Sequence, residues 1–150
     1  MKHVFANHDL TTGGAGELHD VTDDLLAVVE QSGVRNGMAL VYSPHTTCAI
    51  VINELESGFL EDFVDWLETL IPERRYYRHD DLAVRTQGLE EDTADYPNGH
   101  SHVRAGLLAS SSQTIPIVDG SLLLGRWQRV FLCELDRERP RKVFMQVMGE

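Results

Sequence analysis

Short runs of apolar residues, separated by polar turns, divide the chain into segments that have the length of strands. Several of these runs are rich in β-branched residues, and glycine, asparagine, aspartate or proline interrupts them. This pattern predicts short strands with at least one buried face. The expected strands are residues 2–9, 38–42, 48–52, 114–118, 130–135 and 142–148.

Two longer segments repeat apolar residues at the spacing of an amphipathic helix. The first runs from Leu18 to Val29, has aspartates near its start, where the helix dipole favours anions, and ends at Ser32-Gly33. The second covers residues 57–71 and is closed by Pro72. A short third helix is expected over residues 103–108.

The balance between these elements indicates the fold class. Strands outnumber helices, and no alternation of strand and helix runs through the chain. We expect an α+β fold, a β-sandwich of mostly antiparallel strands that carries two amphipathic helices, in a single domain over residues 1–150. The polar stretch 73–100 is longer than an ordinary connection, which is typical of functional or disordered segments.

The charge of the chain narrows the choice of partners. Thirteen Lys and Arg against 24 Asp and Glu give a net charge of −11 with histidine neutral. Such a chain repels nucleic-acid backbones unless it carries a local basic patch, and none stands out in the sequence. We therefore expect no nucleic-acid partner. No apolar window approaches the roughly 20 residues of a membrane span, so we expect no membrane partner either.

The N-terminus and the two cysteines bear on the compartment. The first residues are polar and strand-like and lack the apolar core of a secretory signal, which indicates a cytoplasmic protein. Cys48 and Cys133 lie in apolar runs without CxxC spacing, so we interpret both as buried thiols.

Seven histidines are the first candidates for chemistry, because an imidazole can bind a metal or carry a proton near neutral pH. His45 lies between two expected strands, His79 precedes two aspartates, and His102 follows a glycine turn. If these three converge, three neutral imidazoles and a water would form an open zinc site. The alternatives are loop histidines that are hydrogen-bonded or solvated. His100 is a candidate fourth member, and His3, His8 and His19 are expected to be bystanders.

Polar residues after the 48–52 strand and in a later turn form a second set of candidates. Asn53 and Glu54 follow the strand directly, and a polar cluster beside buried strands needs hydrogen bonds or a ligand. In the turn, Trp127 offers a flat stacking surface, and Gln128 offers both a donor and an acceptor. The alternative for this turn is a tight glycine bend with a core tryptophan.

The order and spacing of these clusters resemble the YjbQ family, and the similarity covers nearly the whole chain. The block from Ser112 to Val130, with Ser-x-x-Ile-x-Ile before Gly-x-Trp-Gln-x-Val, is the most specific part. Arg126 departs from the family pattern, since Thr is usual there, and its guanidinium would bind a phosphate or pair with an acid. The other matching stretches are His45-Thr46-Thr47 through Asn53-Glu54, Tyr77-Arg78-His79-Asp80 and Asn98-Gly99-His100-Ser101-His102.

The resemblance implies a small β-sandwich that assembles as a homotrimer, with the histidine cluster near a subunit interface. It also implies a secondary thiamine-phosphate synthase activity, which joins a pyrimidine diphosphate and a thiazole phosphate and releases pyrophosphate. The expected partner is therefore a small phosphorylated molecule. Taking the residues and the resemblance together, we expect Glu54, His79 and Asp80 to be catalytic and His45, His79 and His102 to be the metal ligands. The expected substrate-binding residues are Thr46, Asn53, Arg126, Trp127 and Gln128.

A divalent metal is the expected cofactor, and three histidine ligands favour zinc over magnesium, which prefers carboxylates. Two other functions stay open at this point. A metal-activated water with Glu54 as general base would make the chain a hydrolase of a small molecule. A trimer whose buried metal or anion is structural would be a binding protein without turnover.

Overall fold

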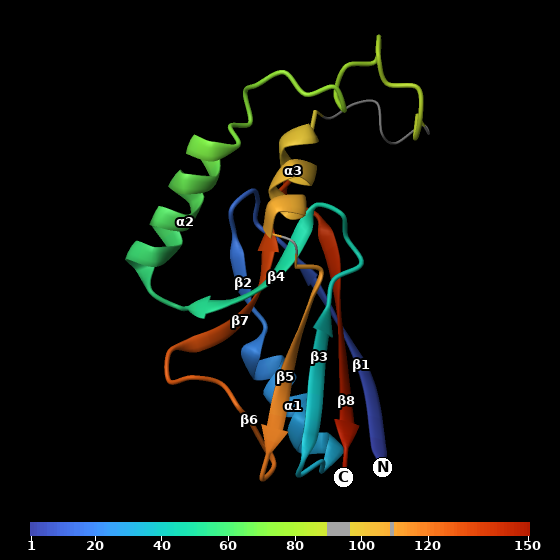
Figure 1. Ribbon diagram of the computed structural model, residues 1–150, viewed down its shortest axis with the longest axis vertical. Helices are drawn as coiled ribbons and strands as arrows, with labels where there is room; N and C mark the ends of the chain where they lie inside the picture. The colour runs from blue at the N-terminus through green and yellow to red at the C-terminus, as the bar shows by residue number, and fades with distance from the viewer. Residues whose placement is uncertain (90–96, 109) are drawn as a thin grey trace.

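Two antiparallel sheets and three helices make up residues 1–89, 97–108 and 110–150, the part of the chain that the computed structural model describes (Figure 1). The strands are β1 (Lys2–Thr11), β2 (Leu18–Asp20), β3 (Gly37–Tyr42), β4 (Cys48–Glu54), β5 (Ser112–Val118), β6 (Ser121–Leu122), β7 (Gln128–Glu134) and β8 (Pro140–Gly149). The helices are α1 (Thr22–Ser32), α2 (Ser57–Leu70) and α3 (Gly99–Leu108). The larger sheet has strand order β1-β8-β3-β5-β6, and the smaller has order β2-β7-β4. All of these pairs are antiparallel, which confirms the expected α+β fold.

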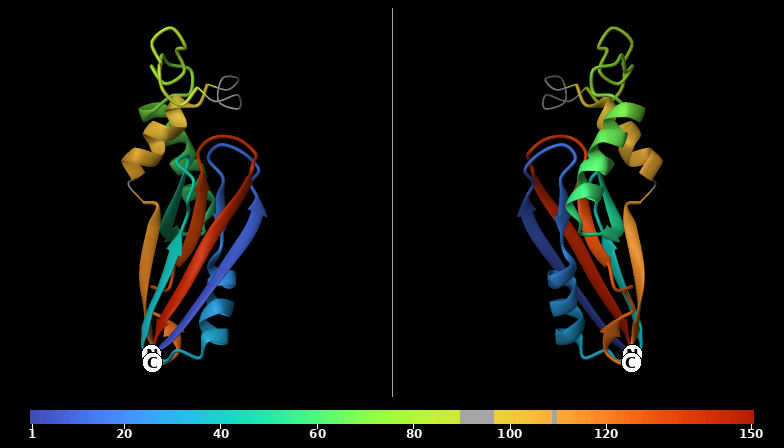
Figure 2. Two further views of the ribbon diagram at one scale, coloured as in Figure 1. Left: turned by 90° about the vertical axis from the view of Figure 1, so that its right-hand side faces the viewer. Right: turned by 90° about the vertical axis from the view of Figure 1, so that its left-hand side faces the viewer.

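The alternation of buried and exposed side chains along the strands produces a layered core. The inner face of the larger sheet, the smaller sheet and α1 share one cluster of buried side chains, which includes Leu25, Val41 and Val143. On the other face of the smaller sheet, Leu67 of α2 packs in a second cluster with Cys133. Figure 2 shows α1 beside the sheets, and α2 and α3 together near the end opposite the termini. The two sheets therefore enclose the core, as a sandwich does.

Both cysteines are buried, as the sequence predicts. Burial, together with the nearby carboxylate of Glu134, raises the pKa of Cys48 to about 12. Burial also raises the pKa of Cys133. A thiol reacts as its thiolate, so neither cysteine is a nucleophile near neutral pH.

The helix expected from Leu18 starts later, because its first residues form a strand. Leu18 to Asp20 pair with β7 as β2. The Asp20 carboxylate then accepts hydrogen bonds from the backbone N–H and the hydroxyl of Thr22, at 2.9 and 2.6 Å, where α1 begins. Gly33 ends the helix in the left-handed conformation, with φ of 60°, which glycine adopts without strain.

The other two helices differ in how well the sequence predicts them. α2 agrees with the expected second helix, and the Glu56 side chain caps its first turn through two backbone N–H groups. α3 begins before the expected 103–108 helix, so His100 and His102 lie in its first turn and not on a strand. Residues 90–96 of the expected polar connection lie outside the described residues. No helix within the described ranges is long and apolar enough to cross a membrane.

Several connections meet at one end of the sheets. Cys48, the first residue of β4, lies opposite Glu134, the last residue of β7. The β3–β4 connection (residues 43–47) and the β7–β8 connection (residues 135–139) therefore leave the smaller sheet side by side. α3 stands at the same end, opposite the two termini (Figure 1).

Candidate functional site

A cavity of about 500 Å³ opens at this end of the molecule. It lies between the β3–β4 connection, the β7–β8 connection, the segment that carries His79 and Arg85, and the first turn of α3. Its volume falls within the range of about 300–1,000 Å³ that is typical of small-molecule sites. The residues that line it are Pro44, His45, Thr46, Thr47, His79, Arg85, Asn98, His102, Arg137, Arg139, Pro140 and Arg141.

Four arginines give this cavity a positive lining in an otherwise acidic chain. The lining residues in the described part of the chain include no aspartate or glutamate. Arg139 pairs with Asp136 at 3.1 Å, and Arg141 pairs with Glu134 at 2.6 Å. These two positive charges are therefore partly balanced by carboxylates outside the lining.

Arg85 has no acidic partner within residues 1–89, 97–108 and 110–150. Backbone carbonyls hold its guanidinium instead: Nη1 donates to His79 at 3.1 Å, Nε to Gln87 at 3.0 Å, and Nη2 to Gly88 at 2.8 Å. A guanidinium held by neutral groups keeps its attraction for an anion. Among the described residues, no carboxylate therefore balances the charge that Arg85 brings to the cavity.

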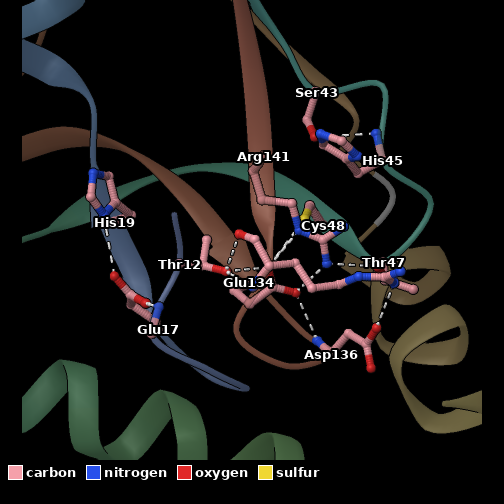
Figure 3. Close-up of polar contacts among 12 residues, drawn as sticks. Thr12, Glu17, His19, Ser43, His45, Thr47, Cys48, Glu134, Asp136 and Arg141 are labelled. Atoms are coloured by element: carbon pink, nitrogen blue, oxygen red, sulfur yellow. Dashed lines mark hydrogen bonds and ion pairs between the residues drawn. The ribbon is translucent and has the colours of Figure 1, made fainter. Parts of the chain in front are cut away.

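A buried carboxylate anchors Arg141 (Figure 3). The Nε and Nη2 atoms of Arg141 donate to the two oxygens of Glu134, each at 2.6 Å, and Nη2 also donates to Thr47 Oγ1 at 3.1 Å. Thr12 Oγ1 donates to the same carboxylate at 2.8 Å. These contacts fix the plane of the Arg141 guanidinium.

The structure brings the three histidines of the expected cluster to this cavity. The rings of His79 and His102 lie 4.4 Å apart between centroids. His45 Nε2 accepts a hydrogen bond from the backbone N–H of Lys142 at 2.9 Å. Burial lowers the pKa of His45 and of His102, and the effect is increased by Arg141 at His45 and by His79 at His102. His45 and His102 are therefore neutral near pH 7.

This cavity does not fit a three-histidine metal site. In the part of the chain that the structure describes, no three His, Cys, Asp or Glu side chains are grouped so that they could hold a metal ion. The Nε2 lone pair of His45 already accepts the bond from Lys142, and Arg85 Nη1 lies 3.4 Å from His79 Nε2. A guanidinium in that position repels a divalent cation. Zinc binding stays a prediction from the sequence, and we assign no step to a metal.

Asp80, an expected catalytic residue, holds the start of α3. Its Oδ1 accepts hydrogen bonds from the backbone N–H groups of Asn98 and Gly99, both at 2.9 Å. A carboxylate at this position satisfies N–H groups that have no partner inside the helix. Asp80 thereby connects the segment that carries His79 to the helix that carries His102.

The other four histidines are not among the described residues that line the cavity. His100 is buried beside the ring of Tyr77, at 6.3 Å between centroids, and lies on a different side of α3 from His102. Figure 3 shows His19 turned toward Glu17, to which it is hydrogen-bonded at 3.2 Å. His8 pairs with Asp24, and His3 with Gln146.

Most of the second set of expected residues lies at the opposite end of β4. Asn53 and Glu54 end this seven-residue strand, about 20 Å from its start at about 3.3 Å per residue. Glu54 lies opposite Gln128 of β7, so the sheet register brings these two together. Trp127 is 62% exposed, and the guanidinium of Arg126 lies 4.6 Å from its ring centroid. Within one chain, these five residues are separate from the cavity.

Sequence reasoning missed the arginines of the cavity, and the expectation that the chain lacks a basic patch was wrong. A signal was present, since Arg137, Arg139 and Arg141 alternate along the chain, and alternate residues of an extended segment share a face. Arg85 is an isolated cation in an acidic stretch, so only the fold reveals its position. Thr46 is the one expected substrate-binding residue that lines the cavity.

Comparison with known proteins agrees with this architecture. A family model described as UPF0047 protein YjbQ-like matches residues 6–150. A UPF0047 protein of Methanothermobacter thermautotrophicus is 40% identical over 141 residues, which cover 94% of this chain and 89% of the relative. The crystal structure of a YbjQ-like protein of unknown function from Sulfolobus solfataricus matches with a TM-score of 0.80 and 32% identity, over 99% of both chains. The chain therefore belongs to the UPF0047 (YjbQ-like) family.

Proposed function

We propose that the chain binds a phosphorylated small molecule in the arginine-lined cavity. One observation carries the proposal: four arginines and three histidines line about 500 Å³, and the described lining includes no acidic residue. Guanidinium groups match the oxygens of a phosphate in geometry and stay charged across the physiological pH range. In a chain with a net charge of −11, this local concentration of positive charge favours an anion at one place.

The candidate reaction is the transfer that the family resemblance implies. The C–O bond between the pyrimidine methylene and its diphosphate breaks, a C–N bond forms to the thiazole nitrogen, and pyrophosphate leaves. Negative charge grows on the leaving group, and arginines that are already fixed in place stabilise it without reorganisation. His79 and His102, with rings 4.4 Å apart, line the same cavity, and an imidazole that gains a proton when the anion binds supplies that proton to the leaving group.

The geometry gives less support to a hydrolase. Its expected general base, Glu54, lies at the far end of β4 from the cavity. None of the described lining residues is a carboxylate that could take its place. A binding protein without turnover would use the same cavity, so an assay has to separate it from the synthase.

Isothermal titration calorimetry with pyrophosphate tests the binding proposal. We expect the wild type to bind and Arg85→Gln to lower the affinity about tenfold or more, because a charge-assisted contact is lost. Arg35→Gln is the matched control, since Arg35 is exposed and pairs with the exposed Asp119 outside the cavity. No binding by the wild type, or equal losses in the two variants, would contradict the proposal.

Product formation from the pyrimidine diphosphate and the thiazole phosphate tests the reaction. We expect it to collapse in folded His45→Ala and His79→Ala variants, because both imidazoles line the cavity. Pyrophosphate binding without any product would support a binding protein instead. Unchanged rates in both variants would assign the activity to another site or to a contaminant.

A further inference from the structure

A buried ion pair stands next to the cavity, and stability alone is a poor explanation for it. Glu134 is 0% exposed and Arg141 is 5% exposed. Removing two charges from water costs about as much free energy as their attraction returns, and apolar side chains of similar volume often stabilise a fold equally well. The geometry of the pair indicates a second role.

The Glu134 carboxylate is fully occupied inside the protein (Figure 3). Its Oε1 accepts from the backbone N–H of Asp136 at 3.0 Å and from Arg141 Nη2. Its Oε2 accepts from Thr12 Oγ1 and Arg141 Nε, and Cys48 Sγ lies 3.9 Å away. A carboxylate offers about four acceptor positions. Glu134 is also not a lining residue, so it acts on a ligand only through Arg141.

The guanidinium of Arg141, in contrast, uses only two of its three nitrogens in hydrogen bonds to described residues. Its Nε and Nη2 atoms are used by Glu134 and Thr47, whereas no described residue accepts a hydrogen bond from Nη1. In the described ranges, every fully buried side-chain nitrogen or oxygen has a hydrogen-bond partner. Since Nη1 has no such partner there, this atom is not fully buried and is accessible to solvent. Nη1 carries two N–H groups that no described residue uses, and Arg141 is one of the residues that line the cavity.

We propose that Arg141 Nη1 is a fixed donor to a phosphate oxygen of the ligand, and that Glu134 is the positioning residue that holds the guanidinium in place. This inference rests on the proposed function. Arg85, which lacks an acidic partner among the described residues, supplies the attraction for the anion. Arg141, whose charge Glu134 balances, supplies a donor of fixed position that orients the phosphate. The ligand class is a tetrahedral oxyanion, a phosphate ester or a diphosphate.

Glu134→Gln separates positioning from simple electrostatics, with inorganic phosphate and pyrophosphate as probes in calorimetry. The substitution removes a negative charge close to the cavity, so electrostatics alone predicts tighter anion binding. Loss of the bidentate anchor predicts weaker binding, by about tenfold to a hundredfold. Arg141→Lys keeps the charge but loses the planar fork, and we expect a similar loss.

Cys48→Ala is the control variant: it removes a buried side chain and so lowers the stability, but it leaves both Glu134–Arg141 hydrogen bonds in place. We expect this variant to bind both probes as the wild type does. Affinity in Glu134→Gln that is unchanged or increased overturns the inference. If the wild type binds and only Arg85→Gln is weakened, the proposed function stands and the inference fails. If the wild type binds neither probe, the proposed function fails.

A crystal structure of the wild type with phosphate keeps the inference testable should the variants not fold. We expect a phosphate oxygen about 2.7–2.9 Å from Arg141 Nη1, the length of a charge-assisted hydrogen bond. A phosphate seated in the cavity without contact to Nη1 overturns the inference.

Discussion

The histidines of the cavity respond to the permanent charges around them. Arginine stays protonated throughout the physiological range, whereas burial lowers the pKa of His45 and of His102. These two imidazoles therefore carry little charge until an anion enters. An anion beside them favours the protonated form and raises both pKa values, which couples binding to proton uptake.

We expect sulfate to bind more tightly at about pH 6 than at about pH 8, as measured by calorimetry. Sulfate keeps the same charge over that range, so a change in affinity reports on groups of the protein. His102→Asn should flatten this dependence, whereas His8→Asn, on β1 outside the cavity, should leave it unchanged. Equal wild-type affinity at both pH values would contradict the coupling.

The same lowered pKa values affect the stability of the free protein. An unfolded histidine has a pKa near 6.5, so below that pH the unfolded state binds more protons than the folded state. The free energy of unfolding therefore falls as the pH drops from about 6.5 towards the lower folded values, and it is fully retained above that window. Melting curves with and without sulfate should show a smaller acid loss when sulfate is present. A melting temperature that rises on acidification would argue against neutral histidines in the cavity.

For single residues, the sequence predicts the histidines of the cavity but not the arginines around them. His45, His79 and His102 could be predicted because an imidazole binds metals or carries protons and each of these three lies at an expected turn or boundary. The arginines were missed because an arginine in a polar loop is normally solvated, and its burial depends on distant contacts. Arg141 shows this, since its partner Glu134 is the last residue of the buried strand β7, a position at which an acid is normally exposed.

Among the elements, the junction between the 77–81 segment and α3 decides how the histidines face one another. Asp80 joins the two through the N–H groups at the start of α3. Gly99 allows the close approach, since a Cβ there would lie 2.5 Å from Tyr77 Cβ. The distance between His79 and His102 therefore depends on a contact that only glycine permits.

Gly99→Ala should destabilise the fold and weaken pyrophosphate binding together. The added methyl group forces α3 away from Tyr77, at a cost of about 1–3 kcal/mol in the free energy of unfolding. Gly106→Ala is a control in the same helix, because a Cβ there meets nothing within 4 Å and should stabilise α3 by about 0.5–1 kcal/mol. Denaturant unfolding and calorimetry measure both effects. A Gly99→Ala variant with wild-type stability and affinity would refute the role of this junction.

Tertiary contacts, and not the local sequence pattern, set the boundaries of two helices. The apolar spacing from Leu18 suits a helix, yet β7 takes residues 18–20 into the smaller sheet. The helix expected from Val103 starts at Gly99, because the capping carboxylate comes from Asp80, 19 residues earlier. Neither partner is visible in a local window, whereas α2, which is capped by the adjacent Glu56, agrees with the sequence prediction.

For the whole molecule, the fold class follows from the sequence because it depends on many weak signals that agree. Six expected strands, no strand and helix alternation, and polar turns leave an antiparallel sandwich as the consistent solution. The distribution of charge does not follow from the sequence in the same way. The net charge of −11 hides a basic cavity, because the fold brings Arg85 together with the arginines of residues 137–141.

The outer face of the larger sheet carries a cluster of aromatic side chains among polar ones. Phe5 of β1 is 59% exposed and Tyr42 of β3 is 39% exposed, and both rings stack on Phe144 of β8, with centroids 5.6 and 6.3 Å away. Met38 and Val118 extend the exposed apolar surface on neighbouring strands. Exposed aromatic and apolar side chains gathered on one sheet face are typical of an interaction surface.

We expect this face to join copies of the chain into the homotrimer that the family resemblance implies, as measured by size-exclusion chromatography with light scattering. Phe5→Glu places a charge beside Phe144, the central ring of the stack, and should shift the protein to the monomer, because burying that charge costs more than the apolar contact returns. Leu107→Glu is the control, since Leu107 is 69% exposed on α3, away from the sheet face. A wild type that stays monomeric at micromolar concentration would refute self-association. A trimer that survives Phe5→Glu but dissociates with Leu107→Glu would move the interface to the helical end, beside the cavity.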